Sequence, residues 1–150
     1  MLAGATEGTN MQIDPRGPRF GAVITTAVFI AVLITSNVWL LAAQAVVFGI
    51  GTAFGMRYAP YGLVFRSLVR PRLGPPKELE DEAPPRFSQG LGLAFAVIGV
   101  IGYATDATWL GIVAVAFGLI AAFLNGAFGL CLGCELYLLI RRIGPARQAS

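Results

Sequence analysis

Residues 20–56 decide the fold class: Phe20 to Ser36 reads FGAVITTAVFIAVLITS, Asn37 follows, and Val38 to Met56 reads VWLLAAQAVVFGIGTAFGM. Neither run contains a charged side chain. A helix rises about 1.5 Å per residue, so about 17–25 residues cross the hydrocarbon core of a bilayer. Each run therefore predicts one transmembrane helix, and the single residue between them predicts a tight hairpin.

Two further apolar runs predict a second hairpin. Phe87 to Ala104 and Trp109 to about Gly126 are separated only by residues 105–108. The whole chain is 56% hydrophobic and 13% charged, whereas a soluble domain is about 25% charged. We therefore expect the 150 residues to form a single all-α integral membrane domain with four transmembrane helices.

The positions of the basic residues predict the orientation. All 11 lysines and arginines precede the first span, lie between the hairpins or follow the last span, and neither hairpin turn contains one. The positive-inside rule then places both termini in the cytoplasm, in a multi-pass protein of the plasma (inner) membrane surrounded by the lipid bilayer. The arginines flank apolar runs and form no recognition stripe, so no nucleic-acid partner is expected.

The segment between the hairpins divides in two. Tyr58 to Arg72 mixes large apolar residues with arginines, a pattern that predicts a short amphipathic helix on the membrane surface. Residues 73–84 are rich in proline and acidic residues, which is typical of a solvated linker. We interpret its charges as keeping the linker soluble rather than as binding groups.

The order of short motifs suggests an internal duplication. Pro18-Arg19-Phe20 recurs as Pro85-Arg86-Phe87, and Thr35-x-x-x-Trp39-Leu40 recurs as Thr105-x-x-x-Trp109-Leu110. Repeat 1 would cover about residues 18–72 and repeat 2 about 85–145, each a hairpin followed by a cytoplasmic interfacial segment. Because each unit crosses twice, the repeats would be parallel and related by an axis along the membrane normal.

Cys131-Leu132-Gly133-Cys134 is the motif with chemical potential. The apolar run from Trp109 to Ile140 is too long for one span, so we expect a break at Asn125-Gly126, Gly129 or Gly133, followed by a second surface helix. The cysteine pair then lies at the cytoplasmic membrane edge, where two thiols one turn apart can form a disulfide. A helix starting at Cys134 would stabilise its thiolate.

We take Cys134 as the nucleophile and Cys131 as the resolving thiol, with Tyr137 and Arg141 orienting or stabilising sulfur anions. Two other interpretations stay open: a metal bound with ligands from a second chain, and inert cysteines that pack as small hydrophobes. Histidine is absent, which excludes His-ligated haem or zinc and a Ser-His-Asp triad within this chain. We predict no cofactor and no metal, and leave enzymatic activity and homo-oligomerisation open.

Two polar residues lie in or at the end of predicted spans. Gln44 is within the second span and Asn125 closes the fourth. Such residues either mark a substrate path or form hydrogen bonds between helices, and we favour hydrogen bonding because both are uncharged. Asp106 is expected to be a residue of the outer turn.

Both ends of the chain resemble a known family. The opening residues 12–21 (QIDPRGPRFG) and the closing residues 131–137 (CLGCELY) resemble the bacterial membrane family called domain of unknown function 4395, from about Gln12 to Arg142. That family has no assigned activity. Its members, common in actinobacteria, often occur beside thioredoxin-like and rhodanese-like proteins, so the resemblance implies a soluble partner of one of these kinds.

A weaker likeness concerns the cysteine motif. Gly129-x-x-x-x-Cys134-x-x-Tyr137 is similar to the Gly-x-Cys-Pro-x-Tyr ending of small membrane domains fused to some bacterial rhodaneses, with Glu135 in place of the proline. The sequence therefore predicts a membrane protein that exchanges disulfide or persulfide sulfur with a soluble partner. The alternatives are a channel or carrier for a small sulfur compound, and a non-catalytic membrane scaffold or anchor.

Overall fold

The computed structural model describes residues 12–74 and 79–143. In chain order the elements are β1 (Gln12–Ile13), α2 (Arg16–Thr35), α3 (Val38–Phe54), the 3₁₀ turn η1 (Met56–Tyr58), α4 (Pro60–Val64), the π-helical turn η2 (Phe65–Val69), α5 (Arg70–Leu73), β2 (Glu80–Asp81), α6 (Ala83–Ala104), α7 (Thr108–Phe128) and α8 (Leu132–Ile143).

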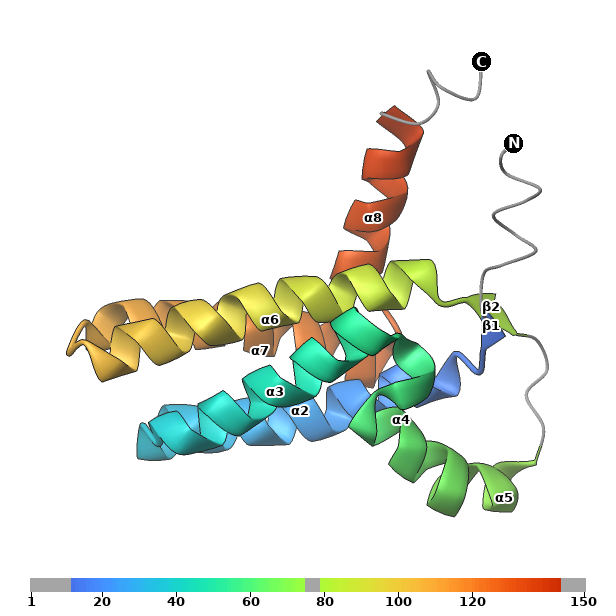
Figure 1. Ribbon diagram of the computed structural model, residues 1–150, viewed down its shortest axis with the longest axis horizontal. Coiled ribbons are helices and arrows are strands. Elements are labelled where there is room, and N and C mark those ends of the chain that lie inside the picture. Colours follow the sequence, from blue (N-terminus) through green and yellow to red (C-terminus); the bar gives the residue numbers. More distant parts are fainter. Residues whose placement is uncertain (1–11, 75–78, 144–150) are drawn as a thin grey trace.

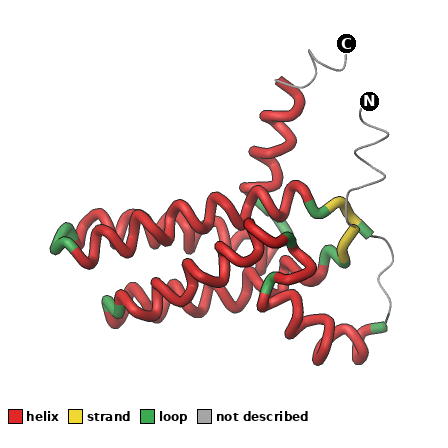
Figure 2. Tube along the Cα trace, in the orientation of Figure 1, coloured by secondary structure: helices red, strands yellow, loops and turns green. Residues whose placement is uncertain are grey.

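Four long helices lie side by side as two hairpins, α2–α3 and α6–α7 (Figure 1). The turns within the hairpins lie at one end of the bundle, whereas α4, the short β1–β2 pair and α8 lie at the other end (Figures 1 and 2). The arginines of the described segments belong to the first turns of α2 and α6 or to elements after α3 and α7. The structure thus gathers these positive charges at one end.

Both turns within the hairpins are short, and each contains a residue with a left-handed φ. α2 ends at Ser36, which adopts a left-handed φ of 54°. The Asn37 side chain then accepts the backbone N–H groups of Trp39 and Leu40 at 3.0 and 3.2 Å, an N-cap for α3. Asp106 is exposed with a φ of 67° in the second turn, so its expected place in a turn between spans is confirmed, whereas the outer side of that turn stays a prediction.

Contacts between the hairpins hold the bundle together. α2 packs along α7 and α3 packs along α6, whereas α2 and α3 touch each other over a much smaller surface. The centre is a cluster of buried apolar side chains in which the Phe29 and Phe48 rings lie 6.1 Å apart. At Gly102 an added Cβ would lie 3.0 Å from the Gly111 Cα, so glycine allows α6 and α7 to approach closely.

The expected all-helical membrane architecture is confirmed at the level of helix length and apolarity. α2, α6 and α7 are each long and apolar enough to cross a membrane, while α3 is apolar but has only 17 residues. Their outward faces carry exposed large apolar side chains, such as Ile34 at 78% and Phe117 at 58% exposure. Such faces suit contact with lipid rather than water.

The segment after α3 differs from the single surface helix expected for Tyr58 to Arg72. It consists of four short helical pieces, and its inner side packs against α2. Phe65 is 2% exposed, and its ring lies 5.7 Å from the Phe20 ring. Leu68 on the outer side is 65% exposed. Burial of Phe65 therefore anchors this segment to the bundle.

The expected solvated linker, residues 73–84, is partly folded, which corrects the interpretation of its charges. β2 pairs antiparallel with β1, with Ile13 opposite Glu80. The Glu82 carboxylate accepts the backbone N–H of Met56 at 3.0 Å and lies 3.8 Å from the Arg86 guanidinium. This carboxylate binds the end of the first hairpin to the start of the second. Residues 75–78 of the linker lie outside the described residues.

The repeated Pro-Arg-Phe motifs make matching contacts across the bundle. Arg19 donates hydrogen bonds to the carbonyl groups of Gly126 and Ala127 near the end of α7, both at 3.2 Å. Arg86 donates in the same way to the carbonyl groups of residues 52 and 53 in α3, at 2.7 and 3.0 Å. Each arginine thus caps the second helix of the opposite hairpin. The pairing supports the duplication, which stays a prediction.

Candidate functional site

The cysteine motif lies where the chain leaves the bundle. α7 ends at Phe128, and Gly129 adopts a left-handed φ of 72° that no β-carbon opposes. The expected break at Gly129 is therefore confirmed. The chain then turns into α8, which packs against the first part of α6 and projects away from the four long helices (Figure 1).

Cys131 and Cys134 are bonded to each other through their sulfur atoms, with Cα atoms 5.1 Å apart. Helix α8 begins at Leu132, so Cys131 occupies the capping position and Cys134 the third helical position. The backbone N–H of Cys134 lies 3.1 Å from the Cys131 sulfur and donates to it. The N-terminus of α8 therefore stabilises negative charge on Cys131, and not on Cys134 as a helix starting at Cys134 would do.

Tyr137 and Arg141 lie further along α8. The Arg141 guanidinium donates a hydrogen bond of 3.0 Å to the Tyr137 hydroxyl, and the Tyr137 ring lies 5.5 Å from the Phe87 ring of α6. These contacts join the two residues to each other and to α6 rather than to the sulfurs. Their role toward sulfur anions stays a prediction, and of these contacts only that between the Tyr137 and Phe87 rings joins α8 to α6.

The glycine within the motif sets the distance between α8 and α6. Gly133 is buried, and a Cβ added to it would lie 2.7 Å from the Ser88 Cβ and 2.8 Å from the Ser88 Cα. A side chain at this position would collide with the α6 backbone. Gly133 therefore lets the cysteine pair lie directly against the bundle.

An apolar cavity of about 350 Å³ lies beside the motif. All four long helices line it, and the first residues of α8 close one side. Its walls include Cys131 but not Cys134, and none of the residues that line it is charged. The other lining groups are mostly aliphatic or aromatic, with a few hydroxyl and amide side chains: Thr25, Ser88, Gln89 and Asn125.

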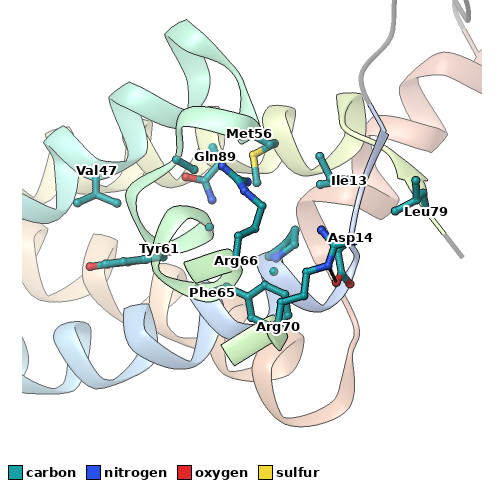
Figure 3. Close-up of a pocket in the computed structure, with 15 residues that line it drawn as sticks. Ile13, Asp14, Val47, Met56, Tyr61, Phe65, Arg66, Arg70, Leu79 and Gln89 are labelled. Carbon is teal, nitrogen blue, oxygen red and sulfur yellow. Dashed lines mark ion pairs between the residues drawn. The ribbon is translucent and has the colours of Figure 1, made fainter. Parts of the chain in front are cut away.

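A second cavity, of about 280 Å³, lies between the start of α2 and the α4–α5 segment (Figure 3). Pro18, Gly21 and Gln89 line both cavities. Arg66 and Arg70 line the second one together with Asp14, so it is more polar than the first.

Asp14 is the buried charge of this second cavity, with its side chain 3% exposed. Its carboxylate lies 2.9 Å from the Arg16 guanidinium and 3.7 Å from that of Arg70. Burial raises the pKa of Asp14, but hydrogen bonds from Arg16 and the charges of both arginines outweigh burial and hold it below its usual value. Sequence reasoning missed this cluster; the only signal was an aspartate just before the first span.

Gln44 connects three helices, as expected for a polar residue within a span. Its side-chain N–H lies 3.4 Å from the Thr25 hydroxyl oxygen, and its carbonyl oxygen accepts the Tyr61 hydroxyl at 2.7 Å. The predicted hydrogen bonding between helices is therefore confirmed for Gln44. Asn125 lines the apolar cavity, and its backbone carbonyl accepts the N–H of Gly129 at 2.9 Å.

Three long apolar helices, a shorter fourth and a cysteine pair against the bundle define a multi-pass helical membrane protein with a Cys-x-x-Cys motif. Within residues 12–74 and 79–143, no three Cys, Asp or Glu side chains lie together as a metal site requires. The chain belongs to the family described as Domain of unknown function (DUF4395), whose family model matches residues 13–142. No curated protein and no solved structure matches the chain.

Proposed function

We propose that this protein is a thiol–disulfide exchange protein of the plasma membrane, whose cysteine pair exchanges disulfide or persulfide sulfur with a soluble thioredoxin-like or rhodanese-like partner. One observation carries the proposal: the Cys131 sulfur caps α8 and accepts the Cys134 N–H, so its thiolate is stabilised when the disulfide opens. A structural disulfide would not require that arrangement.

Exchange follows from the two positions of the cysteines. A partner thiolate attacks the Cys134 sulfur, the Cys131–Cys134 bond breaks, and Cys131 leaves as the thiolate that the helix N-terminus stabilises. A second partner thiol then loses its proton and attacks the partner sulfur of the mixed disulfide. Cys134 leaves and takes up a proton. The partner is oxidised to a disulfide and the membrane pair is reduced to two thiols.

Single-cysteine variants test this order in cells. In Cys131→Ser the remaining Cys134 should accumulate a mixed disulfide with its partner, visible on a non-reducing gel, because the resolving sulfur is absent. Cys134→Ser should accumulate none. Trapping only through Cys131 would reverse the roles. Unaltered growth under sulfur stress of the Cys131→Ser, Cys134→Ser double variant, with full membrane insertion, would end the proposal.

The proposed location of the site is the cytoplasmic edge, with all four long helices spanning the membrane and both termini in the cytoplasm. It is supported by the gathering of the described arginines at the end that carries α8, since basic residues favour the cytoplasmic side. Reporter fusions to the C-terminus test it. A reporter active only after export would contradict this topology.

A carrier for a small sulfur compound is the second candidate, because the apolar cavity reaches Cys131. The uncharged walls favour a neutral compound over a sulfur anion. Uptake of hydrogen sulfide into vesicles containing the protein, faster than into protein-free vesicles and independent of both cysteines, would favour this candidate over thiol exchange.

A further inference from the structure

We infer that the apolar cavity beside Cys131 is a quinone site, and that a membrane quinone accepts the electrons of the reduced cysteine pair. The inference rests on the proposed function, because only a pair that is reduced by a partner needs to be reoxidised. The juxtaposition that carries it is a reactive sulfur forming part of the wall of a cavity within the bundle.

The two cysteines are placed for two different reactants. Cys131 lines the cavity, whereas Cys134, one turn into α8, does not. Cys131, whose sulfur becomes the stabilised thiolate, is therefore the cysteine on the cavity side, and Cys134, whose sulfur meets the soluble partner, is not part of the cavity lining. This arrangement lets one disulfide pass electrons between a water-soluble and a membrane-bound reactant.

The lining chemistry identifies the class of ligand. A volume of about 350 Å³ is within the range of small-molecule sites, which runs from about 300 to 1,000 Å³. No charged residue lines the cavity, which disfavours nicotinamide and flavin nucleotides because their phosphates would lose solvation without a cationic partner. The hydroxyl of Ser88 and the amides of Gln89 and Asn125 can donate hydrogen bonds to the carbonyl oxygens of a quinone.

The outer wall of the cavity reaches the lipid-facing surface of α7. Phe117 and Ile120 line the cavity, and their side chains are 58% and 53% exposed. A ligand dissolved in the bilayer thus meets this wall directly, and an isoprenoid tail can remain in lipid while the ring enters. A quinone is a lipid-soluble, two-electron carrier with a polar ring edge, so it fits the volume, the uncharged lining and the exposed wall of this cavity.

The step balances without a further reactant. The two thiols form the Cys131–Cys134 bond and give up two electrons and two protons, and the quinone gains both as it becomes the quinol. Cys131, as the thiolate in the cavity wall, faces the ring. The thiolate adds to the ring, Cys134 loses its proton and attacks the Cys131 sulfur, and the bond from Cys131 to the ring breaks with its electron pair left on the quinol.

The test uses the full chain in lipid nanodiscs, reduced and kept free of oxygen, with decylubiquinone as the probe. All ring positions of this quinone are substituted, so an adduct with the thiolate cannot rearrange to a stable thioether. Loss of quinone absorbance should accompany closure of the disulfide, in a ratio of one quinone to one cysteine pair. In parallel, exchange of the same protein with a soluble thioredoxin is measured in the absence of quinone.

Filling the cavity should separate the two activities. Ala121→Phe, or the smaller change Ala122→Leu, places extra volume in the cavity wall and should slow quinone reduction by about tenfold or more, with exchange within about twofold of the parent rate. Ala43→Phe is the matched control, because Ala43 is exposed on α3 and lines neither cavity. It should leave both rates unchanged.

If the cavity-filling variants fail to fold, labelling by a quinone in a protein whose cavity is not filled still measures binding. An azido-quinone should label α2, α6 or α7, which supply most of the cavity wall, in the Cys131→Ser, Cys134→Ser double variant, which cannot react. Labelling elsewhere, or exchange with thioredoxin without any quinone reduction, would overturn the quinone site and leave the proposed function standing. Absence of exchange in the parent protein would instead overturn the proposed function.

Discussion

Replacing Gly133 by alanine should move the cysteine pair away from the bundle. The new Cβ would lie 2.8 Å from the Ser88 Cα, whereas ordinary contacts begin at 3.4 Å, so the start of α8 must withdraw from α6 to restore contact. The obstacle is backbone and cannot rotate aside. Overpacking of this kind costs about 1–3 kcal/mol, and the helix propensity of alanine offsets at most about 1 kcal/mol.

We therefore expect Gly133→Ala to lower the free energy of unfolding by about 1–2 kcal/mol. Gly90→Ala, in the facing helix α6, is the matched control, since its Cβ would lie 3.6 Å from the nearest atom, on Thr52. That variant should be neutral or more stable by up to about 1 kcal/mol. Unfolding of both proteins in mixed detergent micelles measures the difference.

The same pair of variants should differ in activity. Withdrawal of α8 takes the Cys131 sulfur out of the cavity wall, so Gly133→Ala should impair quinone reduction more than exchange with a soluble thioredoxin. Gly90→Ala should retain both. Equal stability of the two variants would refute the close packing of Gly133 against α6. Equal loss of both reactions would refute the assignment of the cavity to quinone reduction.

Three further predictions concern the polar contacts of the bundle. Folding lowers the pKa of Asp14, so its carboxylate stabilises the protein at pH values above the ordinary pKa of 3.8. That stability is lost as the pH falls through the lower pKa of the folded protein. Acidification from about pH 5 to about pH 3 should therefore destabilise the parent more than Asp14→Asn in thermal melts. Gln44→Leu should lower the free energy of unfolding by about 1 kcal/mol, and adding Tyr61→Phe should lower it little further, because both changes remove the same hydrogen bond. Additive losses would show that the two residues act independently. In a Glu82→Gln background, which removes the ion pair of Arg86, Arg19→Gln and Arg86→Gln should each lower the free energy of unfolding by about 1 kcal/mol, discounted for exposure. Clearly unequal losses would argue against the duplication.

Sequence reasoning succeeded where one physical effect dominates. Long uncharged runs can only be buried in lipid or in protein, so the approximate positions of the four long helices followed from hydropathy. The break at Gly129 followed from the length limit of a span. The hydrogen bonds of Gln44 followed from the cost of an unpaired amide in an apolar layer.

The remaining features depend on contacts between distant residues. Asp14 and Glu82 resembled solvated surface acids, because their arginine and backbone partners are known only once the helices are assembled. The start of α8 at Leu132 differed by two residues from the position that would have placed Cys134 at its N-terminus. The cavity beside Cys131 arises from all four long helices together, and no local pattern encodes it.

The pairing of helices across the hairpins has a consequence for the order in which the protein is made. α2 leaves the ribosome first, yet its main neighbour α7 is synthesised near the end of the chain. The carbonyl group of Gly126 that Arg19 caps is likewise synthesised long after Arg19. The first hairpin therefore resides in the bilayer as a separate, loosely joined pair until the second arrives, and helices that insert independently can associate afterwards. Cys131 and Cys134 follow α7 in the chain, so the proposed exchange site forms only after both hairpins have been synthesised.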